Sequence, residues 1–472
     1  MLAAWHFLLP HVTSLVGVIM GAYLVLRLLG ERRPTGSTMA WIFAVLLVPY
    51  VGVPFYLVFG GRKLKRKAAS KDELYGAGET AAVDALGDEP VARMLCAFGV
   101  PPPCAGNHCQ LLTTGEQAWA TLLETIDNAQ HRLHISTLIL GDDEIGDEVI
   151  ARLTKRAQAG VEVRLLMDAL FMPYSAGRRL KPLLRAGGRT AGFMPVVHLS
   201  FSGHANLRLH RKIVVADDRV AIVGGMNLAL EYMGPTPLQT RWHDLSARVV
   251  GPAVRDIAAI FRADWAFAAG ETLAAPSSAA GDTALGDGAT ASDGAAARLQ
   301  VVGSGPDVQS DLLYDAFLSA IFDARHRLWF ATPYFVPDEA LTHAIILAVR
   351  RGVDVRILVP AKSDHFIADL AGFSTLRDIA AVGARIDAFG PGMMHAKVII
   401  VDDTLGIMGS ANLDMRSLFL DYEIALFTST AADVRALAAW YESLLPSCGP
   451  LPPAGRVRAF GEDVCRLLGP LV

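Results

Sequence analysis

The sequence predicts an α/β protein with two similar domains in tandem, preceded by a hairpin of two transmembrane helices. Three observations lead to this prediction: a motif that occurs twice, matching segments around each copy, and two apolar stretches near the N-terminus. The chain has 472 residues, 52% of them hydrophobic, which is enough for two sizeable cores. Its five cysteines are scattered and odd in number, which argues against a disulfide framework and favours a reducing compartment.

The repeated motif is a histidine, a lysine two residues later and an aspartate five residues after the lysine. It reads "HRKIVVAD" in the first copy and "HAKVIIVD" in the second. The histidine and the lysine share one face of an extended strand, whereas the odd interval to the aspartate places that residue off this face or in the following turn. An asparagine follows each histidine, in "GGMN" and "GSAN". The residues concerned are His210, Lys212, Asp217 and Asn227 in the first copy and His395, Lys397, Asp402 and Asn412 in the second.

Segments on either side of the two motifs also match. "HRLHIS" at His131 corresponds to "HRLWFA" at His326, and "AGVEVRLLMD" from Ala159 corresponds to "RGVDVRILVP" from Arg351. Each member of the second pair combines a helix end, a glycine C-cap and a β-branched strand. Helix and strand signals alternate in both halves, which predicts α/β units with a mixed or largely parallel sheet buried by helices on both sides.

Domain boundaries follow from the repeats and from shifts in composition. The small, polar segment "AAPSSAAGDTALGDGATASDGAAA" from Ala274 has no periodicity, which is typical of a flexible linker. The expected parts are residues 1–67 (two transmembrane helices and a basic segment), 68–110 (connecting segment), 111–270 (first domain), 271–298 (linker), 299–446 (second domain) and 447–472 (C-terminal tail).

Two N-terminal stretches, Met1–Leu26 and Met39–Phe59, contain no Lys, Arg, Asp or Glu. Roughly 20 apolar residues at about 1.5 Å each span a bilayer core, so these stretches predict two transmembrane helices. A cleaved signal peptide is the alternative for the first, but its start lacks a basic region and no small-residue cleavage site follows. The basic run "GGRKLKRK" after the second stretch predicts that both termini, and with them the catalytic domains, face the cytoplasm.

Composition narrows the class of partner. The net charge is −4 and no basic stripe is interleaved with aromatic residues, so nucleic acid is a poor substrate candidate. A membrane lipid is favoured, and the basic run could also attract anionic headgroups at about 1 kcal/mol per residue. Cys104, His108 and Cys109 lack a fourth ligand at metal-site spacing, so neither a metal nor another cofactor is expected. The oligomeric state is left open. The tryptophans expected to be core or interfacial aromatics are Trp41, Trp242, Trp265 and Trp329.

The paired histidines, lysines and asparagines fit displacement at a phosphodiester. Such a reaction needs a nucleophile, an acid for the leaving alkoxide, and donors that hold the phosphoryl oxygens. One neutral imidazole can attack phosphorus while the other, as imidazolium, protonates the leaving group. Each imidazole also needs an acceptor to fix its tautomer, and Asp244 in "DLSARVV" and Glu423 in "DYEIALF" stand at equivalent places to provide one.

The doubled motif, "GGMN" and "GSANLDMRS" resemble the phospholipase D superfamily. The two apolar stretches, "TPYFVPD" and the closing "FGEDVCRLLGPLV" extend the resemblance, over nearly the whole chain, to the bacterial cardiolipin synthases. This resemblance implies two α-β-α sandwich domains related by a pseudo-twofold axis, with the active site at their interface. It also implies transfer of a phosphatidyl group, through a phosphohistidine, from one phosphatidylglycerol to another at the bacterial inner membrane, giving cardiolipin and glycerol.

Three alternatives to this activity remain. Phospholipase D-type hydrolysis to phosphatidic acid uses the same residues with water as the acceptor, and pocket dryness decides between the two. A tethered nuclease is disfavoured because no basic groove is evident. A non-enzymatic scaffold that binds anionic lipid would tolerate decay of the motifs, and both are intact.

The resemblance also assigns roles to individual residues. The first histidine is usually the nucleophile in this family. The first motif has Gly225 where the second has Ser410, so only the second half can offer a hydroxyl to the phosphate, and Asp421 stands where the family has asparagine. The catalytic set implied is His210, Lys212, Asp217, His395, Lys397 and Asp402, with Asn227, Asn412 and Ser410 on the phosphate and Asp244 and Glu423 behind the histidines.

Overall fold

The structure is a computed structural model that describes residues 21–29, 35–50, 71–76, 89–172, 176–194, 207–274 and 296–466, with single positions at 19, 52, 53, 56, 83, 86 and 87. Most of the first expected transmembrane stretch, the basic run at 60–67, most of the expected linker and the last six residues of the tail lie outside the described residues. The chain divides into a small N-terminal unit and a large unit that contains both motifs.

The N-terminal unit is helical. Its described residues include helical positions 21–29 and α2 (Thr35–Leu47). The rings of Trp41 and Tyr56 meet edge-on, with centroids 5.4 Å apart, in a small apolar cluster. α2 ends ahead of Pro49, because proline removes a helical hydrogen bond and crowds the preceding turn. None of the helices in the described part of the chain combines the length and apolarity needed to cross a bilayer, so the predicted transmembrane hairpin is not shown.

The first half of the large unit alternates strands and helices, as the sequence predicts. α8 begins because Asp143 accepts hydrogen bonds from the backbone N–H groups of Ile145 and Gly146, and it ends at the predicted glycine, Gly160, which adopts a positive φ of 88°. The elements are β1 (Cys104–Leu112), α7 (Gly115–Asn128), β2 (Arg132–Thr137), α8 (Glu144–Gln158), β3 (Glu162–Asp168), α9 (Ala176–Arg179), α10 (Lys181–Arg185), β4 (Arg189–Phe193), β5 (Ile213–Ala216), β6 (Val220–Gly224), β7 (Ser246–Val250) and α11 (Ala253–Ala269).

The second half repeats this order. Asp338 caps α13 through the backbone N–H of Leu341, and Gly352, at φ 85°, follows the helix as Gly160 follows α8. The elements are β8 (Ala297–Ser304), α12 (Leu312–Asp323), β9 (Arg327–Ala331), β10 (Phe335–Val336), α13 (Glu339–Arg350), β11 (Asp354–Pro360), α14 (Phe366–Ala381), β12 (Arg385–Phe389), β13 (Val398–Val401), β14 (Leu405–Gly409), β15 (Leu413–Asp414), α15 (Met415–Phe419), β16 (Glu423–Thr428) and α16 (Ala431–Leu444). Outside the two halves lie α6 (Pro90–Ala97), the 3-10 helix Leu445–Ser447, β17 (Cys448–Gly449) and α17 (Arg456–Arg466).

The two halves share one continuous mixed sheet of 15 strands, in the order β17-β12-β11-β9-β13-β14-β16-β8-β1-β7-β6-β5-β2-β3-β4. The order β1-β7-β6-β5-β2-β3-β4 matches β8-β16-β14-β13-β9-β11-β12, and antiparallel pairing of β1 with β8 joins the halves. The expected boundary at residue 110 is therefore too late, because β1 begins at Cys104. This strand is largely exposed, so it lacks the apolar alternation that would have revealed it.

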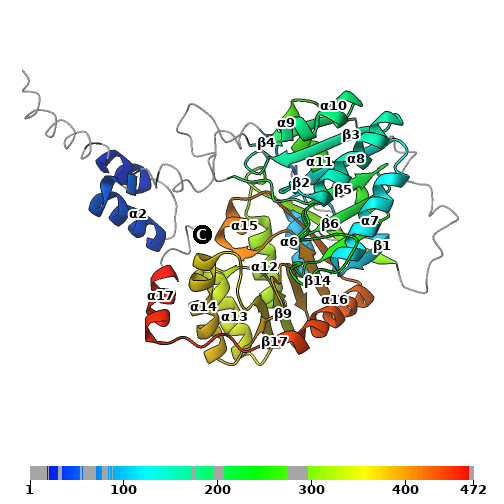
Figure 1. Ribbon diagram of the computed structural model, residues 1–472. Helices are drawn as coiled ribbons and strands as arrows, with labels where there is room; N and C mark the ends of the chain where they lie inside the picture. The colour runs from blue at the N-terminus through cyan, green and yellow to red at the C-terminus, as the bar shows by residue number, and fades with distance from the viewer. Residues whose placement is uncertain are drawn as a thin grey trace, which may run out of the picture. The chain divides into compact units, whose positions relative to one another are not determined.

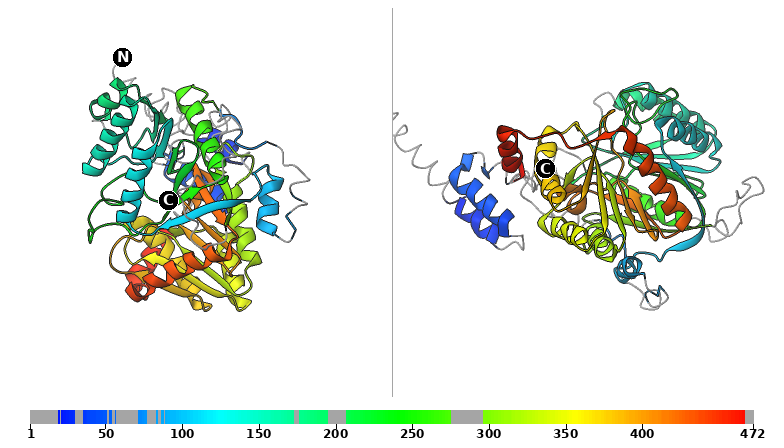
Figure 2. Two further views of the ribbon diagram at one scale, coloured as in Figure 1. Left: turned by 90° about the vertical axis from the view of Figure 1, so that its right-hand side faces the viewer. Right: turned by 90° about the horizontal axis from the view of Figure 1, so that it is seen from below.

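Helices cover both faces of the sheet. α11 and α16 pack on one face, over a core that runs across both halves and contains Trp265, Tyr422 and Trp440. On the other face, α7 and α8 cover the first half, and α12 and α13 cover the second. Figure 1 shows the two halves side by side, one cyan to green and one yellow to red. In the right-hand view of Figure 2, the orange-red α16 and the yellow-green helices lie on opposite sides of the second half's strands.

A buried ionic cluster holds the junction of the halves. The ammonium of Lys71, from the connecting segment, lies 2.5 Å from Asp264 of α11 and 2.6 Å from Asp307, which follows β8. The guanidinium of Arg211 lies 2.6 Å from Asp264, and its Nε donates to the backbone carbonyl of Glu423. Two cations and two carboxylates, almost completely buried, therefore connect the connecting segment with both halves.

Candidate active site

Both motif histidines lie in short extended segments just before a strand rather than within it. His210 precedes β5 and His395 precedes β13. Each segment is anchored to the opposite half: the backbone N–H of His210 donates to the carbonyl of Tyr422 at 2.9 Å, and that of His395 donates to the carbonyl of His243 at 2.7 Å. The chain thus brings the two histidines to the seam between the halves.

The acidic partners of the histidines are also exchanged between the halves. His210 Nδ1 lies 2.9 Å from Glu423 Oε1, and His395 Nδ1 lies 2.6 Å from Asp244 Oδ2. Asp244 and Glu423, the two carboxylates predicted as histidine acceptors, therefore lie against the histidines, and each comes from the other half. A carboxylate at Nδ1 makes Nδ1 the protonated nitrogen, so Nε2 of each ring carries the lone pair. That of His395 faces the ammonium of Lys397, whose Nζ lies 3.1 Å from Nε2.

Burial keeps both imidazoles neutral. It lowers the pKa of His210 against the opposing effect of Glu423. Burial, reinforced by the ammonium of Lys397, lowers the pKa of His395 to about 3. Burial alone would raise the pKa of Asp244, but Lys397 and His395 together bring it below its usual value, so this partner stays ionised.

The two motif lysines lie beside their histidines. Lys212 Nζ donates to the backbone carbonyl of His210 at 2.7 Å, and Lys397 Nζ lies 2.7 Å from His395 Nδ1. Both lysines are almost completely buried. Burial lowers the pKa of Lys212 to about 7 and that of Lys397 to about 8. Both ammonium groups are therefore poorly solvated and suited to pairing with an incoming anion.

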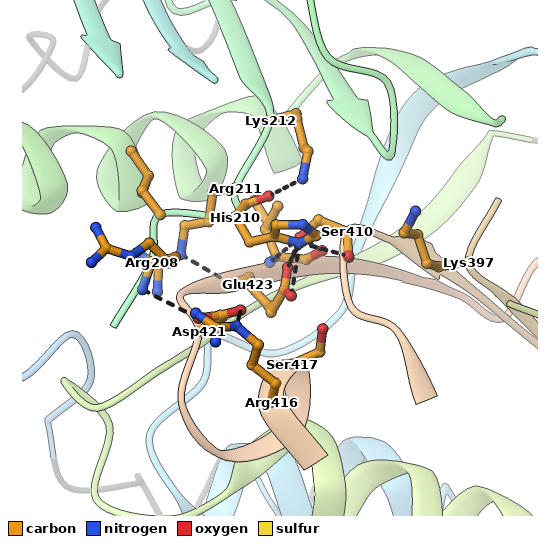
Figure 3. Close-up of polar contacts among 12 residues, drawn as sticks. Arg208, His210, Arg211, Lys212, Lys397, Ser410, Arg416, Ser417, Asp421 and Glu423 are labelled. Atoms are coloured by element: carbon orange, nitrogen blue, oxygen red, sulfur yellow. Dashed lines mark hydrogen bonds and ion pairs between the residues drawn. The ribbon is translucent and has the colours of Figure 1, made fainter. Parts of the chain in front are cut away.

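The three residues expected to hold the phosphate, the two asparagines and Ser410, have different surroundings. Asn227 and Asn412 are buried, and Asn227 Oδ1 accepts a hydrogen bond from the backbone N–H of Ile139 at 3.3 Å. The hydroxyl of Ser410, which was expected on the phosphate, donates to Glu423 and accepts from the backbone N–H of Ile424. In the structure, Ser410 thus supports the carboxylate that contacts His210. Figure 3 shows His210, Glu423 and Ser410 in contact.

The motif aspartates lie at the far ends of β5 and β13, away from the histidines. Asp217, at φ 54°, accepts hydrogen bonds from the backbone N–H groups of Gln130, His131 and Arg132. Asp402, at φ 49°, does the same for residues 325–327. Their place in the catalytic set is therefore corrected to a structural role, as the odd spacing and the turn signal already indicated.

Replacing Asp402 with alanine is expected to lower the free energy of unfolding by about 2–4 kcal/mol, because three backbone donors lose their acceptor. Asp402→Asn should cost less, since one oxygen of the side chain can still accept from the N–H groups of His326 and Arg327. The thermal midpoint in one detergent, followed by circular dichroism, measures both. Equal midpoints for wild type and Asp402→Ala would contradict the assignment.

Three aromatic side chains surround His395, and the sequence assigned none of them to the site. The centroids of Tyr232, Trp242 and Tyr334 lie 5.3, 4.9 and 6.4 Å from that of His395. Trp242 packs against the core of the first half, as predicted, and is in addition a neighbour of the site. The only signal for Tyr334 was its place in "TPYFVPD", which contributed to the family resemblance.

A second polar cluster flanks His210 (Figure 3). Asp421 accepts from the backbone N–H of Arg208 at 3.2 Å and from Arg416 Nε at 3.1 Å. Asp168 accepts from the backbone N–H of Leu209 at 2.8 Å and so also holds the His210 segment. Burial raises the pKa of Asp421 to about 7. In the described part of the chain, no group of three or more His, Cys, Asp or Glu side chains is arranged to hold a metal ion.

Two related halves, each bringing a histidine and a lysine to a shared seam with exchanged carboxylates, define a phospholipase D-like protein. A family model described as "Cardiolipin synthase, PLD-like domain" matches residues 122–265 and 317–445, and one described as "Phospholipase_D-nuclease N-terminal" matches residues 18–61. The chain belongs to the family of cardiolipin synthases with phospholipase D-like domains.

Similar proteins agree with this membership. The chain is 33% identical to a cardiolipin synthase of Halalkalibacterium halodurans, over 94% of this chain and 90% of that protein. It is 31% identical to a cardiolipin synthase of Geobacillus thermodenitrificans, with the same coverage. A solved structure, phosphatidylserine synthase of Haemophilus influenzae, has a similar fold, with a TM-score of 0.56 at 16% identity over 79% of this chain and 94% of that one.

Proposed function

We propose that this protein is a phosphatidyltransferase that converts two phosphatidylglycerol molecules into cardiolipin and glycerol. The observation that carries the proposal is the pair of histidines at one seam, each with Nδ1 on a carboxylate of the other half. This arrangement leaves Nε2 of His210 to attack phosphorus and Nε2 of His395, which lies 3.1 Å from Lys397 Nζ, to carry a proton. The relatives named cardiolipin synthase, which align over nearly the whole chain, support phosphatidylglycerol as the substrate.

In the first step, Nε2 of His210 attacks the phosphorus of the donor lipid. The bond from phosphorus to the glycerol headgroup breaks, and His395, as imidazolium, protonates the departing oxygen. The side chain of His210 is 14% exposed against 5% for His395, so His210 is the more accessible nucleophile. The phosphodiester anion between Lys212 and Lys397 offsets their charge and raises the pKa of His395, which enables it to carry the proton.

In the second step, a terminal hydroxyl of a second phosphatidylglycerol attacks the phosphohistidine. Neutral His395 takes the hydroxyl proton, the bond between phosphorus and nitrogen breaks, and His210 is regenerated. The lysines, with Asn227 and Asn412, hold the phosphoryl oxygens in both steps. Tyr232, Trp242 and Tyr334 shield His395 from water, which favours a lipid hydroxyl as the acceptor over hydrolysis.

We further propose that the N-terminal unit anchors the enzyme in the bacterial inner membrane. Its support is the two uncharged stretches in the sequence and the match of residues 18–61 to an N-terminal family model. The basic run after the second stretch places the catalytic halves on the cytoplasmic side in this proposal. We also propose a linker of residues 271–296, with the first half extended to Cys104 and the second to Ala297, and a tail whose β17 and α17 join the second half.

Mass spectrometry of lipid and soluble products tests the proposal. Purified full-length protein is given phosphatidylglycerol alone, with the double variant His210→Ala, His395→Ala as control. Cardiolipin and glycerol, absent in the control, are expected. Phosphatidic acid without cardiolipin would show a hydrolase instead, and equal cardiolipin from the double variant would contradict the assigned site.

Introducing a side chain at Gly225 should damage the site more than removing one at Ser410. A Cβ at Gly225 would lie 2.2 Å from Asp244 Oδ1, so the acceptor of His395 must move. We expect Gly225→Ala to lower kcat on the order of 100-fold, because small displacements of catalytic groups are costly. Ser410→Ala removes one hydrogen bond to Glu423 without a clash and should cost less than about tenfold. A smaller loss in Gly225→Ala than in Ser410→Ala would refute this comparison.

The pKa values predict a bell-shaped dependence of kcat/KM on pH. The lysines must be charged to hold the phosphate, so activity falls as pH rises through about 7 to 8, where Lys212 and Lys397 lose their protons. On the acid side, His210 must be neutral in order to attack. Because its pKa is lowered, it stays neutral at pH values at which an ordinary histidine would be protonated. Lys212→Arg should move the alkaline limb from about pH 7 towards about pH 8, because arginine remains charged and Lys397 then becomes the first lysine to lose its proton. An unchanged alkaline limb in this variant, despite measurable activity, would contradict the role of Lys212.

A further inference from the structure

The C-terminal helix α17 (Arg456–Arg466) packs on the protein with its polar residues and exposes its apolar ones. Glu462 is 1% exposed and is paired with Arg377 of α14, while Asp463 accepts a hydrogen bond from Ser374 of the same helix. Val457 and Phe460 are 88% and 71% exposed. With Val464 they form a stripe at positions i, i+3 and i+7, which is one face of a helix. We call Val457, Phe460 and Val464 the α17 stripe.

More exposed apolar side chains lie on loops and at the start of α14, at one edge of the sheet. Of the twelve large hydrophobic side chains that are exposed among the described residues of the large unit, five occur there and three form the α17 stripe. The two most exposed of these five are the first two residues of α14, Phe366, at 72%, and Ile367, at 51%. We call this group the apolar rim; it consists of Leu170, Phe171, Leu238, Phe366 and Ile367.

The rim lies at the edge of the sheet where the histidines are. His395 immediately precedes β13, whose Val398 is paired with Ala331 at the end of β9, so the carboxyl ends of β9 and its parallel neighbour β11 mark the active-site edge. Phe366 and Ile367 follow β11 at this edge, and Leu170 and Phe171 follow the equivalent strand β3. Both halves therefore present exposed apolar side chains around the seam.

Packing links α17 to the same region. Cys465 of α17 and Tyr334, the neighbour of His395, both pack against one small cluster that contains Val336 and Ala368. The hydroxyl of Tyr334 also bonds Asp364, two residues before Phe366, at 2.6 Å. The helix that carries the α17 stripe, the segment that carries Phe366 of the apolar rim and the imidazole of His395 are thus connected through one group of packed residues.

We propose that the apolar rim and the α17 stripe dock on the lipid bilayer, so that phosphatidylglycerol reaches the seam from the membrane surface without passing through water. This inference rests on the proposed function, since it names the surface through which that site receives its lipid. Contiguous exposed apolar patches mark interaction sites. Exposed Arg456 at the start of α17 complements the anionic headgroups of phosphatidylglycerol, as in helices that lie in the membrane interface, whereas Arg466 at its end is paired with Asp378 of α14.

The first test compares two forms of the substrate. Full-length Phe366→Glu and Phe460→Glu variants are assayed on vesicles of equal parts dioleoyl phosphatidylglycerol and dioleoyl phosphatidylcholine, and on dihexanoyl phosphatidylglycerol kept monomeric. Because a carboxylate opposes insertion, we expect activity on vesicles to fall about tenfold or more, with less than about a twofold change on the monomer. The matched control is Phe322→Glu, since Phe322 is 52% exposed at the opposite edge of the sheet, and it should change neither activity.

An unchanged rate on vesicles, or equal losses on both substrates, would overturn the inference. Failure of the wild-type protein to form cardiolipin from either substrate would instead refute the proposed function. Hydroxyl-radical labelling of wild type supplies an independent readout, because Phe460 is more exposed than Phe322 in the structure. In vesicles we expect Phe366 and Phe460 to be protected and Phe322 to be labelled. Equal labelling of all three, or the same protection in lipid-free amphipathic polymer, would show that the bilayer does not cover this surface.

Discussion

Replacing either His210 or His395 with alanine is expected to abolish cardiolipin formation, with a loss of about 10⁴-fold or more in kcat. A loss of this size is typical of residues that act together as nucleophile and acid–base partner. Each variant should still fold, because Lys212 and Lys397 remain near the buried carboxylates of Glu423 and Asp244 and balance their charge. Turnover of phosphatidylglycerol at substrate saturation measures the effect.

The two histidine variants should differ on a substrate that needs no acid. A phosphatidyl ester of p-nitrophenol has a leaving group that departs without protonation, so only the nucleophile is required for the first step. His395→Ala should release a burst of p-nitrophenol and retain a phosphohistidine at position 210. His210→Ala should show neither the burst nor the adduct. The reverse pattern would assign the nucleophile to His395, and a burst in both variants would refute the phosphohistidine proposal.

Local spacing allowed much of the fold and site to be predicted. The interval between His210 and Lys212 recurs at His395 and Lys397, and matching strands around them predicted two related α/β halves. Asp244 and Glu423 were found because they occupy equivalent places after the motifs. These inferences need only the order of residues within one half. The same order in the second half supports them independently.

Contacts across the seam could not be predicted, because they depend on how the halves pack. Nothing in the order of residues shows that Glu423 serves His210 while Asp244 serves His395. Ser410 was assigned to the phosphate because its place after the motif does not show which group its hydroxyl contacts. In the structure that group is Glu423 of the same half, the carboxylate that also contacts His210. Trp242 looked like an ordinary core aromatic until the seam brought His395 against it.

The buried ionic cluster behind His210 is a second feature that sequence could not reveal. Lys71 looked like part of a connecting segment, yet its ammonium lies between Asp264 and Asp307 and is 4.8 Å from the ring centroid of Tyr422. Arg211 completes the cluster on the face of its segment opposite His210. The two cations balance the two carboxylates in a site that is buried from water. Removing any one of the four groups therefore leaves an opposite charge without its partner.

Lys71→Met is therefore expected to destabilise the protein by about 3–5 kcal/mol, since it leaves a buried carboxylate without its counter-charge. For halves of this size the thermal midpoint should fall by about 6–20 °C. Lys155→Met, on the exposed surface of α8, is the matched control and should change the midpoint little. Adding Asp307→Asn to Lys71→Met should recover part of the loss, because the unpaired charge is removed. Additive losses in the double variant would mean that Lys71 contributes packing rather than charge balance at the seam.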